Sequence, residues 1–578
     1  MPTASPRVRA AALQFAVGPD LDDNLATCLR LIDQAAPHRP DLVVLPEFIN
    51  HIAWYTDAAH CHQVAVELDG PFLGTLAAKA AEHGCYLKVN VTLRRAAGQV
   101  TGTNILFGPD GQRLAVNDKQ VLMGNENNFL TPASEAGPVV RTPIGALGMY
   151  ACMDGVINEV ARGLEVRGAQ ILLNSLNSFA HDEASLHIPV RAAENKVFIV
   201  AANKVGGLVP SDLVEAVAAR LKIAPHFLHG AGESQIVAPD GTVLAKAPRT
   251  GEAVVVADLE LAQADAKRRP DGTDLLTSRR PELYGPIGAP PAAPAPRRGA
   301  AEIAAAVYQP AGDGPAVVAE IAAAVSAAAR AGVQFLVLPE LVHLPGGRVT
   351  DPAAAAAESA RFSAAVAAAL PPEGACFVVA SIVEAAGAGY THTGVLIGRD
   401  GVRLRQPQLH TAGRHPWVTD LGRELRTVDL PFGRAAVIVG NDALYPETFR
   451  LATLQDVEVV GVPTTLLEPW EMTTGLLERA AENRLNVVAA ARPGPAGTSA
   501  VIAITEDFTL WTEWKNRPFD GNITYPAVTR AAAGPGLTRA SVYPAAAANR
   551  LISQRTDVVD GRPWRLVQAL TGTEAAAL

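Results

Sequence analysis

The feature that most constrains the fold of this chain is an internal repeat whose period is close to half the chain length. The run Asp-Leu-Val-Val-Leu-Pro-Glu at 41–47 returns as Gln-Phe-Leu-Val-Leu-Pro-Glu at 334–340. The run Arg-Ala-Ala-Glu-Asn at 191–195 returns unchanged at 479–483, in the same order along the chain. Because the repeats of solenoid proteins are far shorter, these matches indicate the duplication of a whole domain.

The duplication predicts two domains joined by a linker. With 578 residues, the chain is long enough for each half to bury a core of its own. Residues 285–300 are rich in proline, which predicts a stiff and extended linker. We therefore expect a first domain at 1–284 and a second domain at 301–578.

Within each half, short apolar runs alternate with helical patterns, which predicts a layered α/β domain. Hairpin signals at Asp110-Gly111 and Asp240-Gly241 argue against a simple parallel, doubly wound sheet. The predicted strands of the first half lie at 10–17, 42–45, 171–173 and 198–202, and the predicted helices of the chain include 22–35, 71–83 and 353–369.

The composition argues against several classes of partner. The net charge of −9 disfavours nucleic acid, because binding phosphates requires a basic face. The five cysteines are irregularly spaced and form no CxxC pair, which argues against a disulfide framework and a zinc site. No apolar run approaches the roughly 20 residues of a membrane span. We expect a cytoplasmic protein without a metal or membrane partner, in which a thiol stays reduced.

Four side chains of the first half could act together in catalysis. Glu47 ends a predicted strand, Lys119 and Glu126 lie close together in sequence, and Cys152 ends a later apolar run. A thiol becomes a nucleophile when a base or a cation lies nearby. A carboxylate can take the thiol proton. A lysine and the N–H of Met153 can stabilise the oxyanion that forms when the thiolate attacks a carbonyl.

This set resembles the Glu–Lys–Cys triad of the nitrilase, or carbon–nitrogen hydrolase, superfamily. Any one of the matching motifs is weak, but their shared order is specific. The motifs are Pro-Glu at 46–47, Lys119, Glu-x-x-x-x-Thr-Pro at 126–132, Cys-x-Asp followed by a glutamate at 152–159, Arg-x-x-Glu-Asn at 191–195, Ala-Ala-Asn at 201–203 and Arg-Arg-Pro-Glu-Leu-Tyr at 279–284.

The resemblance implies an α/β fold of two tandem α-β-β-α sandwich domains, packed as an intramolecular pseudo-dimer. It also implies that Glu47 is the general base, Lys119 the oxyanion stabiliser and Cys152 the nucleophile. Glu126 resembles an additional glutamate of the family that positions substrate or assists proton transfer. The implied reaction forms a thioester on Cys152, which water activated by Glu47 hydrolyses, and it requires neither a metal nor an organic cofactor.

The substrate stays open among small-molecule amides, ureides and nitriles. Met153 and Asn158 depart from the usual family pattern, so similarity alone does not identify the substrate. Cys-Met-Asp resembles the amidase and carbamoylase branches more than the Cys-Trp-Glu of true nitrilases. We therefore expect amide hydrolysis, with N-carbamoyl amidohydrolase and nitrilase as alternatives. Asn174 and Asn177 follow a predicted strand that should end near the site, and they are candidate substrate-binding residues.

The second half lacks the same set. Glu340 matches Glu47 and is either a solvated carboxylate or a structural remnant. Leu409 falls at the position of Lys119, a one-residue shift offers Gln408 or His410 instead, and Gly440 replaces Cys152. We therefore predict a degenerate domain that folds and acts as a built-in partner of the first.

Two further possibilities concern the whole protein. Members of this superfamily often assemble, so a homo-oligomer is possible. The alternative to an enzyme is a non-catalytic binding or scaffold protein. The complete set of Glu47, Lys119, Glu126 and Cys152 in the first half argues against that alternative.

Overall fold

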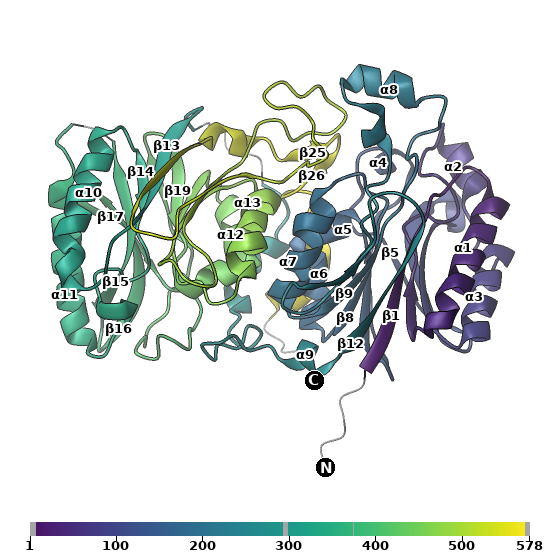
Figure 1. The fold of residues 1–578 in the computed structure, drawn as a ribbon, viewed down its shortest axis with the longest axis horizontal. Coiled ribbons are helices and arrows are strands. Elements are labelled where there is room, and N and C mark those ends of the chain that lie inside the picture. Colours follow the sequence, from purple (N-terminus) through teal and green to yellow (C-terminus); the bar gives the residue numbers. More distant parts are fainter. Residues whose placement is uncertain (1–6, 293–298, 374, 573–578) are drawn as a thin grey trace, which may run out of the picture. The chain divides into compact units, whose positions relative to one another are not determined.

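The computed structural model describes residues 7–292, 299–373 and 375–572, which divide into two compact units (Figure 1). The first unit comprises Met1–Ala266, Asp507–Ile523 and Leu551–Leu578, as far as these residues are described. The second unit comprises Lys267–Glu506 and Thr524–Arg550. These units cross the domain boundaries predicted at 284 and 301, because segments at the end of each sequence repeat belong to the other unit.

Two six-stranded sheets form the middle of the first unit, with the orders β12-β1-β2-β3-β4-β5 and β11-β10-β9-β8-β7-β6. The inner strands pair in parallel and the outer strands pair antiparallel. The strands are β1 (Arg7–Gln14), β2 (Leu42–Val44), β3 (Tyr86–Arg94), β4 (Val100–Phe107), β5 (Arg113–Asp118), β6 (Val139–Thr142), β7 (Gly145–Ala151), β8 (Ile171–Ser175), β9 (Phe198–Ala202), β10 (Gln235–Val237), β11 (Val243–Lys246) and β12 (Ala253–Glu260).

Helices cover the outer faces of both sheets in the first unit. The helices are α1 (Leu21–Ala35), α2 (Ala58–Val64), α3 (Pro71–His83), α4 (Glu126–Phe129), α5 (Met153–Val156), α6 (Asn158–Val166), α7 (Ile188–Asn195), α8 (Val214–Leu221), α9 (Ala262–Asp265) and α14 (Gln568–Thr571). Side chains of β1 alternate between two cores. Ala11 and Leu13 pack towards α1 and α3, whereas Ala10 and Ala12 pack between the sheets. The result is the predicted α-β-β-α sandwich, with α6 and α7 as its other outer layer (Figure 1).

The second unit repeats this architecture. Its sheets have the orders β17-β16-β15-β14-β13-β24 and β18-β19-β20-β21-β22-β23, which match those of the first unit strand for strand. The strands are β13 (Ile303–Gln309), β14 (Phe335–Val337), β15 (Phe377–Ala386), β16 (Gly389–Gly398), β17 (Gly401–Pro407), β18 (Thr427–Leu430), β19 (Gly433–Val437), β20 (Val459–Pro463), β21 (Asn486–Ala490), β22 (Ala500–Ala503), β23 (Ala527–Arg530) and β24 (Gly536–Val542). The helices are α10 (Val318–Arg330), α11 (Pro352–Ala369), α12 (Pro446–Thr453) and α13 (Leu476–Asn483).

The predicted elements agree with the structure except at a few ends. The helix predicted at 71–83 is α3, and Gly84 closes it with a φ of 63°. The strand predicted at 10–17 is β1, but it begins at Arg7 because that residue pairs with Glu260 of β12. It ends at Gln14, before the apolar residues Phe15 and Val17, which are buried without continuing the strand.

The predicted extended linker begins instead as a folded turn. Residues Gly285–Gly288 form a 3-10 helix, and the side chain of Ile287 is only 1% exposed. Burying an apolar side chain favours packing over extension, which the proline content did not reveal. Residues 293–298, in the middle of the predicted linker, lie outside the described residues.

A short hairpin completes the first unit with residues from the far end of the chain. Its strands are β25 (Leu551–Ser553) and β26 (Thr556–Asp557). Segment 507–523 is tied to it because the backbone N–H of Leu510 donates to the carbonyl of Ile552 at 2.7 Å. The first unit therefore includes two segments from the second half of the sequence.

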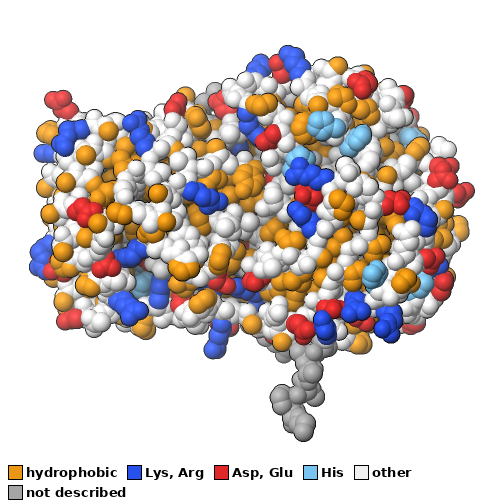
Figure 2. Space-filling model, viewed as in Figure 1, with side chains coloured by type: hydrophobic (Ala, Val, Ile, Leu, Met, Phe, Trp, Pro, Cys, Tyr) orange, Lys and Arg blue, Asp and Glu red, His pale blue; other side chains and the backbone are white. Residues whose placement is uncertain are grey.

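Charged side chains of both signs are interspersed on the face of the molecule shown in Figure 2. Among the described helices, none is both long enough and apolar enough to cross a membrane.

Candidate active site

Lys119 lies at the centre of the candidate site in the first unit, between two carboxylates. It directly follows β5, and its side chain is completely buried. Its Nζ lies 2.9 Å from Oε1 of Glu47 and 2.8 Å from Oε2 of Glu126. Glu47 follows β2 and is also completely buried, whereas Glu126 begins α4. The structure thus brings together three of the predicted catalytic residues.

Burial and charge set the protonation of this group. Burial alone would lower the pKa of Lys119, but the carboxylates of Glu126 and Glu47 raise it well above its ordinary value. Burial raises the pKa of Glu47, and Lys119 opposes that shift. Lys119 is therefore a fixed cation, whereas Glu47 is a carboxylate with increased affinity for a proton.

Cys152 lies where β7 meets α5, in a backbone conformation that side chains rarely adopt. Its φ is 49° and its ψ is −110°. Such a conformation costs about 1–3 kcal/mol and is found where surrounding contacts enforce it. Here the N–H of Cys152 donates to the carbonyl of Ser175 at 2.9 Å and to Oδ1 of Asn174 at 3.2 Å.

The Cys152 thiol is under the electrostatic influence of the same charged group. Burial and the charge of Glu47 raise its pKa well above the ordinary value, and Lys119 opposes this effect. The thiol is therefore neutral at rest and has to give up its proton when it attacks. Glu47 is the nearby group whose proton affinity suits that transfer.

Three other predicted residues surround Cys152 in different ways. Met153 is the first residue of α5, so its N–H has no acceptor within that helix. Asn174 is 1% exposed and uses its amide oxygen to hold the N–H of Cys152. Oδ1 of Asn177 is buried and has no hydrogen-bond partner among the described residues.

Two further buried residues lie near the site, and one of them, Asp154, is the aspartate of the Cys-x-Asp motif at 152–159. Asp154 accepts hydrogen bonds from the N–H groups of Gln120 at 3.0 Å and Val121 at 2.8 Å, which ties the Cys152 turn to the chain after Lys119. Lys204 is 1% exposed, and burial lowers its pKa to about 7. Its position directly after Ala-Ala-Asn at 201–203 was the available signal, since a lysine seldom ends a buried strand.

A sequence model of the family described as carbon–nitrogen hydrolase matches residues 9–269 and 302–511, which is most of both repeats. The chain belongs to the carbon–nitrogen hydrolase family. It is 27% identical to the deaminated glutathione amidase of Mus musculus over 48% of this chain and 85% of that protein. It is 27% identical to the nitrilase of Pyrococcus abyssi over 46% of this chain and 93% of that protein. Each relative thus matches about one repeat.

The chain is also similar to one solved structure of an amidase. The amidase from Nesterenkonia sp. aligns with a TM-score of 0.39 at 24% identity, over 46% of this chain and 95% of that chain.

The second repeat of this family member carries a different set at the matching positions. Backbone hydrogen bonds align the repeats, because the N–H of Lys119 donates to Gly102 and the N–H of Gln408 donates to His392, each at 2.8 Å. The counterpart of Lys119 is therefore Gln408, not Leu409 as first expected. The second repeat reaches this position one residue earlier because β17 starts directly at Gly401.

Glu340 is neither solvated nor free in the second unit. Its side chain is 2% exposed, and Nη2 of Arg414 lies 2.8 Å from Oε1 and 2.9 Å from Oε2. Burial alone would raise the pKa of Glu340. The charges of Arg414 and of the neighbouring histidines outweigh this effect and hold the pKa well below its ordinary value. Unlike Glu47, this carboxylate is a poor proton acceptor.

Gly440 keeps the backbone of the cysteine position without the side chain. Its φ is 56°, close to that of Cys152, and a Cβ atom there would lie 2.5 Å from Oε1 of Glu340. The space that a thiol would need is therefore occupied by the pair of Glu340 and Arg414.

The second unit also contains the best candidate for a metal site among the described buried residues. Glu340, His392 and His415 each offer a ligand atom, and these atoms lie within 4.8 Å of one another. Arg414 already donates to both oxygens of Glu340. A metal ion would have to displace this guanidinium, so the residues fit a cation poorly.

The hairpin of β25 and β26 holds the loop that carries Glu126. Oγ1 of Thr556 accepts from the N–H of Gly124 at 2.9 Å and donates to the carbonyl of Leu122 at 3.1 Å. The second unit repeats this contact, because Oγ1 of Thr273 accepts from the N–H of Gly413 at 2.8 Å. A threonine thus fixes the matching loop in each unit.

Thr556→Val is expected to lower kcat/KM for amide hydrolysis about tenfold or more. It leaves the buried N–H of Gly124 unsatisfied, at a cost of about 1–3 kcal/mol, next to Glu126. Thr273→Val is the matched control and should reduce stability similarly without changing kcat/KM. Steady-state kinetics and thermal unfolding of both variants provide the test. Equal kinetic losses in the two variants would contradict a role in positioning Glu126.

Glu126→Gln is expected to move the acid limb of Cys152 reactivity to lower pH. The charge of Glu126 raises the pKa of Glu47, so removing that charge lowers the pKa and keeps Glu47 deprotonated further into the acid range. The measurement is the rate of Cys152 alkylation by iodoacetamide against pH, followed by peptide mass mapping. Exposed Glu135→Gln is the control, and an acid limb that stays in place in Glu126→Gln would refute this coupling.

Gly440→Cys in a Cys152→Ala background is expected to destabilise the protein and to restore no turnover. The new side chain meets Glu340 and adopts a strained backbone, at a cost of about 1–3 kcal/mol. Urea unfolding and amide turnover are the measurements. Gly163→Ala is the control, because a Cβ atom at Gly163 meets nothing within 4 Å. Turnover above the Cys152→Ala background would show that the second site retains catalytic capacity.

Proposed function

We propose that the first unit hydrolyses an amide bond of a small molecule through a thioester on Cys152. The observation that carries this proposal is the buried Lys119, held between Glu47 and Glu126 beside a strained cysteine. A fixed cation suits a developing oxyanion, and a carboxylate with raised pKa suits the transfer of a thiol proton.

In the first half of the reaction, Glu47 takes the proton of Cys152 as the sulfur attacks the carbonyl carbon. The oxyanion of the tetrahedral intermediate is stabilised by Nζ of Lys119 and by the N–H of Met153. The carbon–nitrogen bond then breaks, and Glu47 returns its proton to the leaving nitrogen. Ammonia or an amine departs, and the acyl group remains on Cys152 as a thioester.

In the second half, a water molecule attacks the thioester and gives a proton to Glu47. The same two donors stabilise the second tetrahedral intermediate. When the carbon–sulfur bond breaks, the proton returns from Glu47 to the sulfur, and a carboxylic acid is released. Glu126 keeps Lys119 oriented throughout, and no metal or organic cofactor takes part in these steps.

We further propose that the second unit is a non-catalytic partner of the first. Gln408 and Gly440 stand where Lys119 and Cys152 would be needed, and Arg414 ties down Glu340. This set lacks a nucleophile and a free base. The folded core of the second unit supports a structural role for it.

Cys152→Ala is expected to abolish turnover across a panel of amides, ureides and nitriles, because the thioester can no longer form. Cys376→Ala is the matched control, since that thiol is 8% exposed against 9% for Cys152 and has no comparable charged neighbours. Intact-mass analysis of the wild-type protein during turnover should show an acyl adduct on Cys152.

Product analysis on the same panel separates the reaction classes. Ammonia or an amine with a carboxylic acid supports the amidase, whereas ammonia together with carbon dioxide identifies an N-carbamoyl amidohydrolase. Release of ammonia and acid from nitriles alone identifies a nitrilase. Unchanged turnover in Cys152→Ala would refute the proposed nucleophile.

A further inference from the structure

A polar cavity of about 490 Å³ opens in the first unit beside the loop that carries Glu126. This volume falls within the range of about 300–1,000 Å³ that is usual for small-molecule sites. Gly124 and Asn125 line the cavity and directly precede Glu126, so an occupant of the cavity touches the same loop as the catalytic group. The remaining lining residues are Trp54, Asn128, Arg220, Trp511, Gln554 and Arg555.

The cavity wall carries two positive charges with no acidic partner. Arg220 belongs to α8 and Arg555 to the turn between β25 and β26, and both side chains are exposed. Nη1 of Arg555 donates to Oδ1 of Asn128 at 2.5 Å. Neither guanidinium forms an ion pair with a carboxylate of the described residues. Arginines suit planar, bidentate recognition of carboxylates, so this wall favours an anion.

Two residues of the wall are held in strained backbone conformations. Trp511 has a φ of 63° and Arg555 has a φ of 65°, although neither residue is a glycine. Left-handed backbone at bulky residues persists only where surrounding contacts enforce it, and such residues cluster at ligand sites. Both strained residues belong to the segments that the second half of the sequence contributes to this unit.

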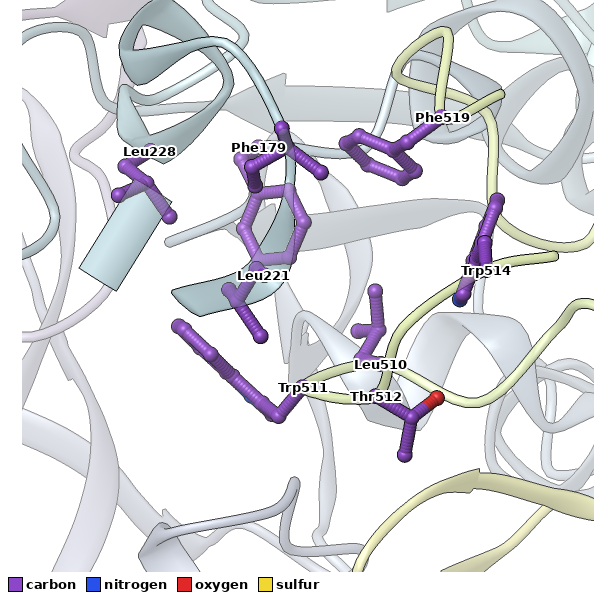
Figure 3. A pocket seen from close by; sticks show the side chains of 9 residues that line it. Phe179, Leu221, Leu228, Leu510, Trp511, Thr512, Trp514 and Phe519 are labelled. Atoms are coloured by element: carbon purple, nitrogen blue, oxygen red, sulfur yellow. The ribbon is translucent and has the colours of Figure 1, made fainter. Parts of the chain in front are cut away.

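An aromatic cluster fixes Trp511 in place. Its ring lies 6.3 Å from that of Phe179, and the ring of Phe519 also lies 6.3 Å from that of Phe179 (Figure 3). The ring of Phe519 lies 4.9 Å from that of Phe227. The cavity inside this cluster measures only about 30 Å³, which has room for a few water molecules at most. The cluster therefore supports the wall of the larger cavity and is too small to bind a substrate itself.

We propose that the larger cavity binds a carboxylate group of the substrate, with Arg220 and Arg555 as its recognition residues. This inference rests on the proposed function and narrows its substrate class to amides that bear a carboxylate away from the bond that is cleaved. Such a group can lie on the acyl side, as in monoamides of dicarboxylic acids, or on the amine side, as in N-(carboxyalkyl) amides.

The test compares carboxylate-bearing amides with neutral amides of the same length. Arg220→Gln and Arg555→Gln should each raise KM for the carboxylate-bearing amide about tenfold, because each removes a charge-assisted hydrogen bond. The loss of kcat/KM on the neutral amide should be much smaller than the loss on the carboxylate-bearing amide. Thermal unfolding checks that both variants fold. Arg141→Gln, at an exposed arginine outside the cavity, is the control.

The substrate series distinguishes the two positions of the carboxylate. On the side that the cavity binds, a carboxylate should lower KM in the wild-type protein. This lowering of KM should disappear in the double variant Arg220→Gln/Arg555→Gln. Raised ionic strength should weaken the same effect. Equal KM values for carboxylate-bearing and neutral amides, or equal losses on both in the variants, would overturn the inference.

These outcomes are separable from a failure of the proposed function. If no amide is turned over in a Cys152-dependent way, the proposed function is wrong. If neutral and carboxylate-bearing amides are turned over alike and depend on Cys152, only the carboxylate site is wrong.

Discussion

The buried ammonium of Lys119 is the interaction on which the first unit's chemistry depends. Removing a cation from water costs several kcal/mol unless paired charges and hydrogen bonds replace the lost solvation. Two carboxylates do so here, and they come from different parts of the fold. Glu47 follows an inner strand of the first sheet, and Glu126 comes from a loop after the edge strand β5. The first sheet and the chain after β5 therefore have to be folded together before the ammonium of Lys119 is paired with both carboxylates.

Burial has a second consequence for this group of charges. It raises the pKa of Glu47 and of the Cys152 thiol, a neighbouring carboxylate adds to each shift, and Lys119 opposes both, so the resting thiol is neutral. A thiol that ionises only during attack is protected from reaction before a carbonyl arrives. In the second unit, the guanidinium of Arg414 pairs with the carboxylate of Glu340, so the two charges neutralise each other, and Gly440 provides no thiol.

Most of the fold could be predicted from local signals in the sequence, and the four central residues could be predicted from their shared order with the motifs of the family. Glu47 and Cys152 stand at the ends of apolar runs, after β2 of one sheet and β7 of the other, and the face-to-face packing of the two sheets brings these strand ends together. The counterpart of Lys119 was predicted one residue too late, since the start of β17 depends on strand pairing rather than on composition. Lys204 was missed, and Asp154 was recognised only as part of the Cys-x-Asp motif, because the contacts of both residues are tertiary. Asp154, for example, is tied to N–H groups about 30 residues away in sequence.

The segments that belong to the opposite repeat were the least predictable part of the structure, and they explain what a duplication within one chain permits. The hairpin with Thr556 contacts the loop before Glu126 in the first unit, and the segment with Thr273 contacts the matching loop in the second. In a dimer of identical chains, both tails would have to carry the same residues. Here the two segments can carry different residues. Arg555, in the segment after β25, lines an open cavity in the first unit. In the second unit, Arg269 is 3% exposed and donates to Oδ1 of Asn441, beside the vacant cysteine position. Duplication within one chain thus allows one of these segments to line an open cavity while the other fills the matching region of the second unit.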